Sequence, residues 1–551
     1  MVRKLIQHFS RRATPQSQAA APKQAPNHAG GYSFVLDDRA RLERFLILGS
    51  EGGTYYVGER QLTVDSAKCV QRCLDADGIG TVELIADLSE SGRAYKQDPA
   101  IFALAMAAGA DQPATRAAAL AVLPRVCRTG SQLLSFVDAV QHFRGWGRSL
   151  RRAVAGWYTA RDVRALAYQV VKYRQRQGWS HRDVLRKAGG AVGPHSLAHE
   201  AVLRWIVDGI DGFDRERVVT RSGRDPQGYG ALAREQLPPI IDAVERLRAC
   251  VDDPAQAARI IDEHRLTHEM VPGELKRHRR VWEALLPHMP VGALLRSLGK
   301  LSEVGVLVGN SEASRHVRAL LADRERLAKA RLHPLAVLTA MRVYAGGRGI
   351  RGKLSWTPVT KVVDALDEAF YACFANVVPS GRRWVLGLDV SSSMGCGQIA
   401  GLPGVTPAVA TAAMALVTLR CETEVELMAF ATRPQKVGIS GRSRLDDVCK
   451  QLAALSFGGT DCAQPMIWAQ EQKIEADAFV VYTDNETWAG KIHPHQALRA
   501  YRERTGIPAK LIVAGMTATQ FSIADPDDAG MLDVVGFDSA APAVMADFVR
   551  G

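Results

Sequence analysis

Residues 382–390 read RRWVLGLDV, an apolar run that ends in an aspartate, and three serines follow it directly. Apolar runs of this length that lead into small polar loops are typical of buried strands in α/β proteins. The same texture continues to the C-terminus, where further strand-like and helix-like stretches alternate: 406–420, 424–430, 443–455, 478–484, 494–504 and 509–515. Strands that alternate with helices predict a parallel, doubly wound sheet, and we assign it to residues 361–551.

Hydroxyl and carboxyl side chains follow three of the predicted strands. Asp389 ends the first strand, and Ser391 and Ser393 lie on the tight loop after it. Thr460 belongs to a second polar loop, GGTD, and Asp484 ends the run AFVVYTD. These loops are expected to converge because the carboxyl ends of parallel strands meet at one edge of a sheet. An all-oxygen set of ligands suits a hard divalent cation, with Mg²⁺ the expected ion.

Upstream of this sheet, residues 32–360 have a helical pattern. Apolar residues recur at spacings of three and four, as in four representative stretches: 99–109, 116–128, 239–251 and 281–299. Many short amphipathic helices in series predict a stacked, HEAT-like helical repeat, and an irregular helical domain is the alternative because no strict period is present. Residues 11–31 are rich in Ala, Pro, Gln and Gly without an apolar period, so residues 1–31 are expected to be a disordered tail.

Charge is distributed unevenly along the chain. Seventy basic side chains against 58 acidic ones give a net charge of +12. Residues 381–551 hold 15 Lys or Arg and 19 Asp or Glu, a net of −4, so the first 380 residues carry +16. A basic helical body beside a slightly acidic α/β domain indicates a polyanionic partner for the body. A basic excess that serves only solubility is the alternative.

The strongest concentration of charge lies in residues 141–190, where twelve Lys or Arg face two Asp, a net charge of +10. Lys172 and Arg176 are four residues apart, which on a helix places both on one face. Such groups neutralise phosphates, and an exposed ring beside them can stack on an unpaired base. The candidates for RNA contact are Lys172, Arg174, Arg176, His181, Arg182, Arg186 and Lys187.

The three polar loops of the α/β region resemble the metal-ion-dependent adhesion site of von Willebrand factor type A domains. The resemblance implies that Ser391, Ser393 and Thr460 ligate the cation directly through their hydroxyls. Asp389 and Asp484 would then act largely through water. An open coordination position would accept an acidic group from a partner protein.

Several longer strings resemble the Ro autoantigen family, the TROVE-domain ribonucleoproteins. They span the chain from near Tyr32 to the C-terminus: GSEGGTYY (49–56), KYRQRQGWSH (172–181), RGIRGKLSW (348–356), SFGGTDCAQPMIWA (456–469), YTDNETWAG (482–490), IPAKLIVAGMT (507–517) and ADPDDAGMLDVVGFD (524–538). Ro proteins fold as a ring of HEAT-like helical repeats closed by a type A domain. The Ala- and Arg-rich composition suggests a bacterial or phage member.

The Ro resemblance also implies partners. It implies a monomeric ring that binds small structured Y RNAs on its basic outer surface and single-stranded ends of misfolded RNA in its hole. It further implies contact of Lys172 and Arg176 with RNA, and an exoribonuclease joined to the ring by such an RNA. One position departs from the family, since Gly189 stands where the family has a histidine.

Other classes of function fit the sequence less well. No apolar stretch is long enough for a transmembrane helix, and nine scattered cysteines indicate reduced thiols, so a cytoplasmic location without a membrane is expected. We expect no enzyme, since no nucleophile motif is present, and a nuclease would need clustered carboxylates for two ions. The second hypothesis is a metal-dependent protein-interaction module whose helical body only positions the type A domain.

Overall fold

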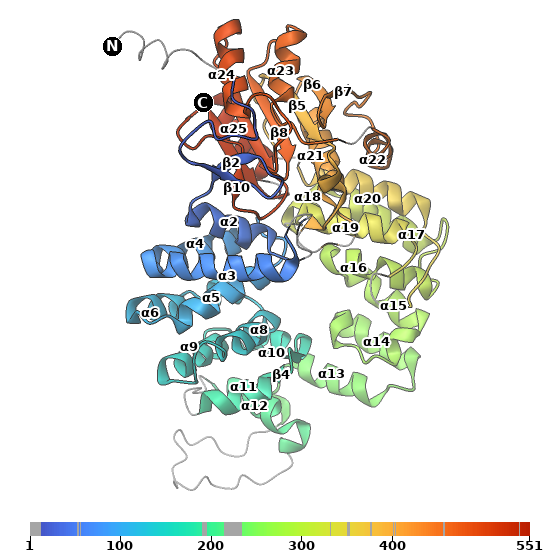
Figure 1. The fold of residues 1–551 in the computed structure, drawn as a ribbon. Helices are drawn as coiled ribbons and strands as arrows, with labels where there is room; N and C mark the ends of the chain where they lie inside the picture. Colours follow the sequence, from blue (N-terminus) through green and yellow to red (C-terminus); the bar gives the residue numbers. More distant parts are fainter. Residues whose placement is uncertain are drawn as a thin grey trace.

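The computed structural model describes residues 13–551 except 52–53, 55–56, 190–195, 214–233, 331, 350–352, 375–376, 400–401, 403, 456–457 and 539. A body of helices runs away from an α/β domain and returns to it, as Figure 1 shows. The α/β domain lies across the two ends of the helical body. The predicted division into a helical part followed by an α/β part is therefore confirmed.

The α/β domain is built on a six-stranded sheet with the order β11-β9-β8-β5-β6-β7. All neighbouring strands are parallel except β6 and β7, which pair antiparallel at one edge. The strands are β5 (Arg383–Asp389), β6 (Glu424–Phe430), β7 (Pro434–Lys436), β8 (Ala478–Thr483), β9 (Lys510–Gly515) and β11 (Met531–Val535). The helices of this domain are α21 (Pro407–Cys421), α22 (Leu445–Ala453), α23 (Gln464–Glu471), α24 (Pro494–Thr505) and α25 (Ala541–Arg550). This is the doubly wound sheet that the alternation of strands and helices predicts.

Alternation of side chains along the buried strands divides the core of this domain into two layers. Val385 and Phe479 belong to one apolar cluster together with Leu498 of α24. Leu386, the next residue on β5, belongs to the other cluster together with Leu416 of α21. Because successive side chains of a strand point to opposite faces, both faces of the sheet are covered by helices, and sites can form only at its edges.

The helical body consists of two arms. The first arm, residues 38–213, contains α2 (Asp38–Leu48), α3 (Glu59–Ala76), α4 (Gly78–Ser91), α5 (Asp98–Gly109), α6 (Pro113–Ala121), α7 (Leu123–Val126), α8 (Gly130–Val140), α9 (Arg148–Thr159), α10 (Val163–Lys172), α11 (His181–Ala188) and α12 (Leu197–Asp208). The second arm, residues 234–374, contains α13 (Pro239–Ala249), α14 (Pro254–His264), α15 (Arg279–Leu285), α16 (Val291–Glu303), α17 (Glu312–Ala322), α18 (Arg324–Lys329), α19 (Pro334–Ala345) and α20 (Thr360–Ala372). Within the described ranges, no helix is both long and apolar enough to cross a bilayer.

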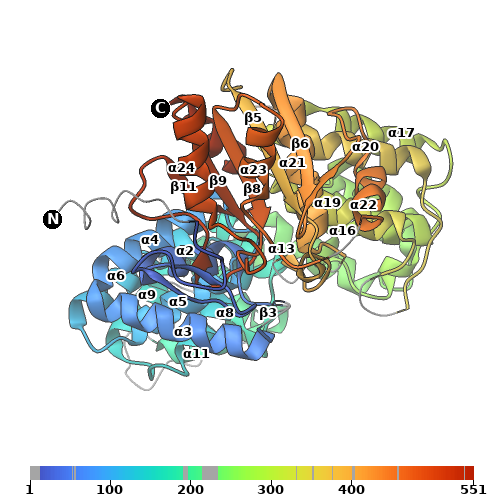
Figure 2. The ribbon, with the colours of Figure 1, turned by 45° about the horizontal axis from the view of Figure 1, so that its top comes forward.

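The two arms and the α/β domain together form a ring. In Figure 1 the first arm descends from α2 on the left and the second arm ascends to α20 on the right. Seen from above in Figure 2, the two arms lie on opposite sides of the sheet. His333 Nε2 of the second arm lies 3.1 Å from the carbonyl oxygen of Arg93 in the first arm. At the far end of the ring, Lys172 of α10 lies 3.8 Å from Glu269 of the second arm.

Prolines divide two of the helical stretches that the sequence pattern merges. Pro124 lies at the start of α7, and α6 ends before it, so 116–128 is not one helix. In the stretch 281–299, Pro287 and Pro290 separate α15 from α16. Proline ends a helix because it lacks the backbone N–H and clashes with the preceding turn. The boundary assigned at residue 360 is also early, since α20 packs on α17 and α19 of the second arm.

The N-terminal segment is ordered where the structure describes it. Residues 1–12 of the predicted disordered tail lie outside the described residues, and for residues 13–31 the prediction is wrong. The strand β1 (Gln24–Pro26) pairs with β2 (Tyr32–Val35), which pairs with β10 (Phe521–Ser522) of the α/β domain. The composition misleads here because this segment gains its order from contacts with the C-terminal half, which no local pattern reveals.

A buried arginine joins the first arm to the α/β domain. Arg44 of α2 is 1% exposed, and its Nη2 donates to both carboxylate oxygens of Asp533 on β11, each at 2.6 Å. Its Nη1 donates to the carbonyl oxygens of Thr517, Thr519 and Phe521 at 3.2–3.4 Å. Short charge-assisted contacts of one nitrogen with both carboxylate oxygens, together with the contacts of the other nitrogen, hold the guanidinium in place. The first helix of the ring is thereby held against β11 of the sheet and the segment that leads from β9 to β10.

We predict that Arg44→Met lowers the stability of the junction by about 3–5 kcal/mol, because it leaves the partly buried Asp533 without its partner. Thermal unfolding followed by circular dichroism measures the change. Arg39→Met on the exposed face of the same helix is the control and is expected to alter the melting temperature little. Equal melting temperatures for the two variants would show that Arg44 does not hold the junction.

Candidate nucleic-acid interface and metal site

A short hairpin with a two-residue turn lies within residues 141–190, which we call the basic region. The strands β3 (Gln175–Arg176) and β4 (Trp179–Ser180) pair antiparallel, and Gln177 and Gly178 between them have φ of +51° and +78°. Positive φ at both turn residues is typical of the tight hairpin turns that fit the twist of the strands. The helix α10 ends at Lys172, so Lys172 and Arg176 do not share a helical face. The prediction that they share a helical face is wrong, because the helix does not continue to Arg176 and the turn at Gly178 forms a hairpin instead.

Exposed cations surround this hairpin. Five of the seven predicted RNA contacts are exposed: Arg174, Arg176, Arg182, Arg186 and Lys187. Four further exposed arginines lie on or beside α9 and α10: Arg148, Arg151, Arg152 and Arg164. None of these nine basic side chains forms a salt bridge with a carboxylate of the described residues. The excess charge that the sequence shows is therefore present as uncompensated charge on the surface.

Lys172 has a different position from its neighbours. Its side chain is 13% exposed and lies 3.8 Å from Glu269 of the second arm. Its ammonium group donates to the Tyr168 hydroxyl at 3.1 Å and lies over the rings of Tyr168 and Tyr173. These contacts direct Lys172 toward the junction between the arms and away from the exposed cations.

His181 is buried and lines a cavity together with Arg174 and Arg182, so its contact with RNA stays a prediction. The residue is 3% exposed, its Nδ1 lies 2.7 Å from the Tyr158 hydroxyl, and its ring stacks on Trp157. Burial lowers the pKa of His181 to about 4. The ring is therefore neutral at physiological pH and supports the core beneath the hairpin.

A cavity of about 490 Å³ lies between the hairpin and helices α11, α12 and α13. Arg174 and Arg182 line it together with Trp205 and Glu245. The Arg174 guanidinium lies 5.9 Å from the centre of the Trp205 ring, and Trp205 Nε1 donates to Glu245 at 3.1 Å. The sequence gives no local signal for Trp205 or Glu245, because only the packing of α12 and α13 brings them to the basic hairpin.

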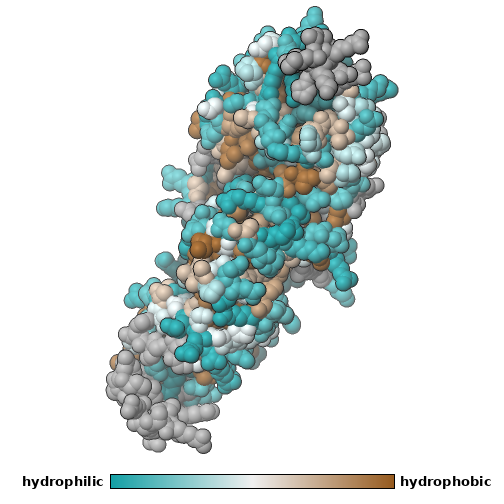
Figure 3. All heavy atoms as spheres, turned by 60° about the vertical axis from the view of Figure 1, so that its left-hand side comes forward, coloured by the Kyte–Doolittle hydropathy of each residue, from teal (hydrophilic) through white to brown (hydrophobic). Residues whose placement is uncertain are grey.

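The face seen from the side of the first arm is mostly hydrophilic, as Figure 3 shows. Apolar residues appear on it as small separate groups. A surface of this kind lacks the broad apolar patch that large protein interfaces use. Contacts that depend on charge and hydrogen bonds suit it better.

We call the loops that carry Asp389, Ser391, Ser393, Thr460 and Asp484 the metal loops, after the site that they are predicted to form. They converge at the carboxyl ends of β5 and β8. Asp389 accepts from the Ser391 backbone N–H at 2.9 Å and from the Thr483 hydroxyl at 2.7 Å. The hydroxyl oxygens of Ser391 and Ser393 lie 3.1 Å apart. All five predicted residues are buried: Asp389, Ser391, Ser393, Thr460 and Asp484. Thr460 lies on the adjoining loop, where its carbonyl oxygen accepts from two backbone N–H groups of residues 488–489.

The two carboxylates of this site lack a basic side chain as a salt-bridge partner among the described residues. Asp389 and Asp484 are 0% and 3% exposed, and neither forms a salt bridge with a basic side chain of the described residues. Burial raises the pKa of Asp389, and burial together with the charge of Asp389 raises the pKa of Asp484 to about 7. Two buried carboxylates beside three hydroxyls fit a divalent cation, which would supply the missing positive charge. No cluster of three His, Cys, Asp or Glu occurs in the described chain, so such a cation would depend on the hydroxyls.

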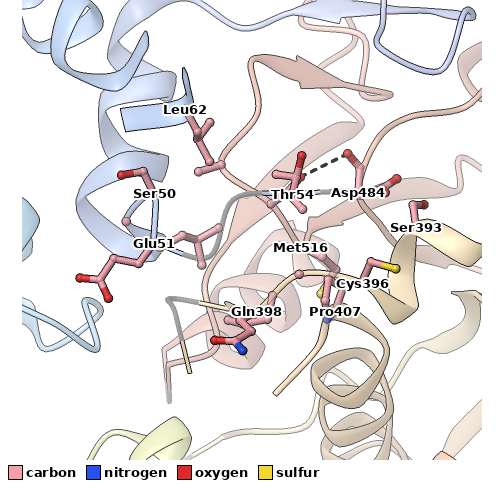
Figure 4. A pocket seen from close by; sticks show the side chains of 16 residues that line it. Ser50, Glu51, Thr54, Leu62, Ser393, Cys396, Gln398, Pro407, Asp484 and Met516 are labelled. Carbon is pink, nitrogen blue, oxygen red and sulfur yellow. Dashed lines mark hydrogen bonds between the residues drawn. The ribbon is translucent and has the colours of Figure 1, made fainter. Parts of the chain in front are cut away.

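The metal loops face the first arm of the ring. A cavity of about 20 Å³, with room for one or two waters, is lined by Ser393 and Asp484 and by Ser50, Glu51 and Thr54 of the first arm. Figure 4 shows Ser393 and Asp484 across this space from Ser50 and Glu51, with Thr54 beside Asp484. The loop after α2 thus borders Ser393 and Asp484, two residues of the predicted cation site.

The fold is a ring of helices closed by an α/β domain, whose loops carry hydroxyl and carboxyl side chains at the carboxyl ends of the strands. It defines a class of ring proteins with two parts. The TROVE domain family model matches residues 25–214 and 241–343, and the Ro60 vWA domain model matches residues 383–549. The chain belongs to the Ro family.

Curated relatives match almost the whole chain. The RNA-binding protein RO60 of Deinococcus radiodurans is 43% identical over 98% of this chain and 97% of its own length. The RNA-binding protein RO60 of Caenorhabditis elegans is 34% identical over 98% of this chain and 92% of its own length. The crystal structure of the Deinococcus radiodurans RO (RSR) protein superposes with a TM-score of 0.69, covering 93% of this chain and 99% of that one.

We predict that the buried, neutral His181 makes the stability of the first arm sensitive to acid. The pKa of His181 is about 4 in the folded chain and near 6.5 when the chain is unfolded. The unfolded chain therefore binds the proton first, and stability is lost as the pH falls from 6.5 toward 4. At pH 5 the loss is about 2 kcal/mol relative to neutral pH.

Thermal unfolding of the His181→Gln variant between pH 7.5 and pH 5 tests this coupling. The variant should lose less melting temperature on acidification than the wild type, while His142→Gln on the exposed surface should behave like the wild type. Parallel pH profiles for wild type and His181→Gln would contradict the assignment.

Proposed function

We propose that this chain is an RNA-binding scaffold that holds RNA on the basic outer surface of its ring. The observation that carries the proposal is the group of nine exposed basic side chains without salt-bridge partners between residues 148 and 187. Uncompensated cations bind phosphates with release of counterions, which supplies affinity that is independent of sequence. The names of the two relatives, both RNA-binding proteins, agree with this assignment.

The arrangement of the charges supports a proposal for the class of RNA. Cations spread over a hairpin and several helices suit a small folded noncoding RNA, such as a Y RNA, recognised by its shape. A single-stranded end of a misfolded RNA would enter the ring. There, a cavity of about 620 Å³ between the arms is lined by Tyr95, Arg296, Lys300 and Trp356. These side chains offer charge for phosphates and rings for unpaired bases.

The α/β domain would bind a divalent cation, with Mg²⁺ the expected ion. Ser391, Ser393 and Thr460 would ligate it through their hydroxyls, and Asp389 and Asp484 would act largely through water. When bound, the cation offers a coordination position to an acidic group. An acidic protein ligand would have to reach that position through the narrow cavity beside the first arm.

Scaffold function fits the fold better than catalysis does. The relatives are named for RNA binding and not for a reaction. We therefore assign no catalytic residues. We further propose a monomeric ring in the cytoplasm that an RNA could join to an exoribonuclease, as the Ro resemblance implies. A metal-dependent protein-interaction module remains the second candidate, favoured by the two buried carboxylates without a cationic partner.

Charge reversal on the hairpin and α11 tests the RNA proposal. The triple change Arg176→Glu, Arg182→Glu and Arg186→Glu should weaken binding of a small structured RNA by more than about tenfold. The slope of log K against log salt should fall by about 2–3, since about three phosphate contacts are lost. Fluorescence anisotropy with a labelled hairpin RNA at several salt concentrations measures both quantities.

A matched control carries the same number of reversals elsewhere on the ring. Arg60→Glu, Lys68→Glu and Arg324→Glu change three exposed residues outside the basic region. The control should retain most of the affinity and most of the salt dependence. Equal losses in both triple variants would reduce the effect to net charge and remove the basic region as the binding surface.

Metal binding should stabilise the α/β domain. At a Mg²⁺ concentration about 100 times its Kd, the folded form gains about 2.7 kcal/mol, which appears as a rise in melting temperature. The double variant Ser391→Ala, Ser393→Ala should lose this rise because two direct ligands are absent. The control Ser440→Ala, Ser443→Ala removes a hydroxyl pair from an exposed turn and should keep it. A wild-type protein whose melting temperature is indifferent to Mg²⁺ would contradict the proposed site.

A further inference from the structure

Residues 13–35 form an N-terminal strap that lies along the loops at the sheet edge of the α/β domain. Figure 1 shows its strand β2 beside β10, next to the C-terminal part of the chain. Within the strap, Gln16 is fully buried, although glutamine is among the residues most often exposed. A buried amide of this kind indicates a specific set of hydrogen-bond partners.

The Gln16 side chain is saturated with hydrogen bonds. Its Nε2 donates to Asp461 Oδ1 at 2.7 Å and to the Ile492 carbonyl oxygen at 2.8 Å. Its Oε1 accepts from the Thr487 hydroxyl and from the Gly490 backbone N–H. An amide can donate two hydrogen bonds and accept two, so all of its capacity is used.

These partners belong to the two loops that carry metal-site residues. Asp461 follows Thr460 directly, and the backbone N–H groups of Trp488 and Ala489 both donate to the Thr460 carbonyl oxygen at 3.0 Å. Gln16 thus ties the loop of Thr460 to the segment that follows Asp484. No other described side chain hydrogen-bonds to both Asp461 and Thr487.

A second group of contacts anchors the strap beside Asp484. Glu486 is fully buried and accepts from the backbone N–H of His28 at 2.8 Å, from that of Ala29 at 3.3 Å and from the His28 ring at 2.8 Å. The backbone N–H of Glu486 in turn donates to Asp484 Oδ1 at 3.2 Å. The carboxylate of Asp484 is therefore oriented by a residue that the strap holds in place.

The strap approaches these loops as closely as a backbone can. A Cβ atom added to Gly31 would lie 1.9 Å from the carbonyl oxygen of Thr487 and 2.7 Å from Cα of Trp488. Both atoms belong to the backbone, so neither can move aside cheaply. The glycine permits the contact that brings the strap onto the loop.

We propose that the strap is a positioning element of the metal site and that Gln16 is its positioning residue. The inference rests on the proposed cation site. Mg²⁺ requires near-ideal octahedral geometry, so the spacing between Thr460 and Asp484 decides affinity. Residues that orient metal ligands typically change metal affinity by 10–100-fold when they are replaced. Gln16 is neutral, so its effect would come from geometry and not from charge.

The experiment measures binding of Mn²⁺, a paramagnetic substitute for Mg²⁺, to the full chain by the electron paramagnetic resonance signal of the free ion. Gln16→Leu should weaken binding by about 10–100-fold. Gln18→Leu makes the same chemical change at an exposed residue of the strap and should stay within about twofold of the wild type.

A third variant separates positioning from general loss of stability. Leu498→Ala removes a fully buried side chain of α24 from the core cluster that also contains Cys462 and Ala463, so it lowers stability near the loops without removing any of their hydrogen bonds. It should keep wild-type Mn²⁺ affinity at temperatures below its melting point, whereas Gln16→Leu should not. Equal losses in Gln16→Leu and Leu498→Ala would overturn the inference, as would wild-type affinity in Gln16→Leu. Absence of Mn²⁺ binding to the wild type would instead overturn the metal site itself, and the inference with it.

Discussion

The ring depends on a buried guanidinium at the point where it meets the α/β domain. The Arg44 side chain is 1% exposed and lies between β11 and the segment after β9. Its guanidinium donates to Asp533 and to three carbonyl oxygens there. A charge in such a position is tolerated because it is paired with an opposite charge and donates further hydrogen bonds. Because Nη2 contacts Asp533 and Nη1 contacts the carbonyl oxygens of the segment after β9, the guanidinium is fixed between two segments, and α2 leaves the sheet in a fixed direction. The loop after α2 is thereby brought to the metal loops.

This junction changes the surroundings of the proposed metal site. In an isolated sheet the loops of Asp389, Thr460 and Asp484 would face solvent. Here the first arm borders them on one side and the N-terminal strap holds them on another. Three segments from distant parts of the sequence therefore meet at one sheet edge. Enclosure of this kind favours a small ligand or a water-filled coordination sphere over a broad protein surface.

The sequence predicts those elements whose structure is determined by their own residues and not by distant contacts. The apolar runs that end at Asp389 and Asp484 predict buried strands, because a buried strand consists largely of apolar residues. The polar residues that follow each run predict the metal loops. The strap could not be found this way, because Gln16 acquires its partners 445 or more residues away. The hairpin was missed although Gly178 signals it, and the burial of His181 depends on Trp157 and Tyr158 of another helix.

The basic region shows why charge outlines function better than single residues do. Nine exposed cations without salt bridges repel one another, and a compact chain gains nothing in stability from such a group. Of the seven predicted contacts, Lys172 and His181 are the two that point inward, where the fold supplies another partner: Glu269 and Tyr158. Charges that the fold does not use remain on the outer wall. With the metal loops enclosed and the outer wall polar, a polyanion that spans the hairpin and α11 is the partner that this surface can hold most firmly.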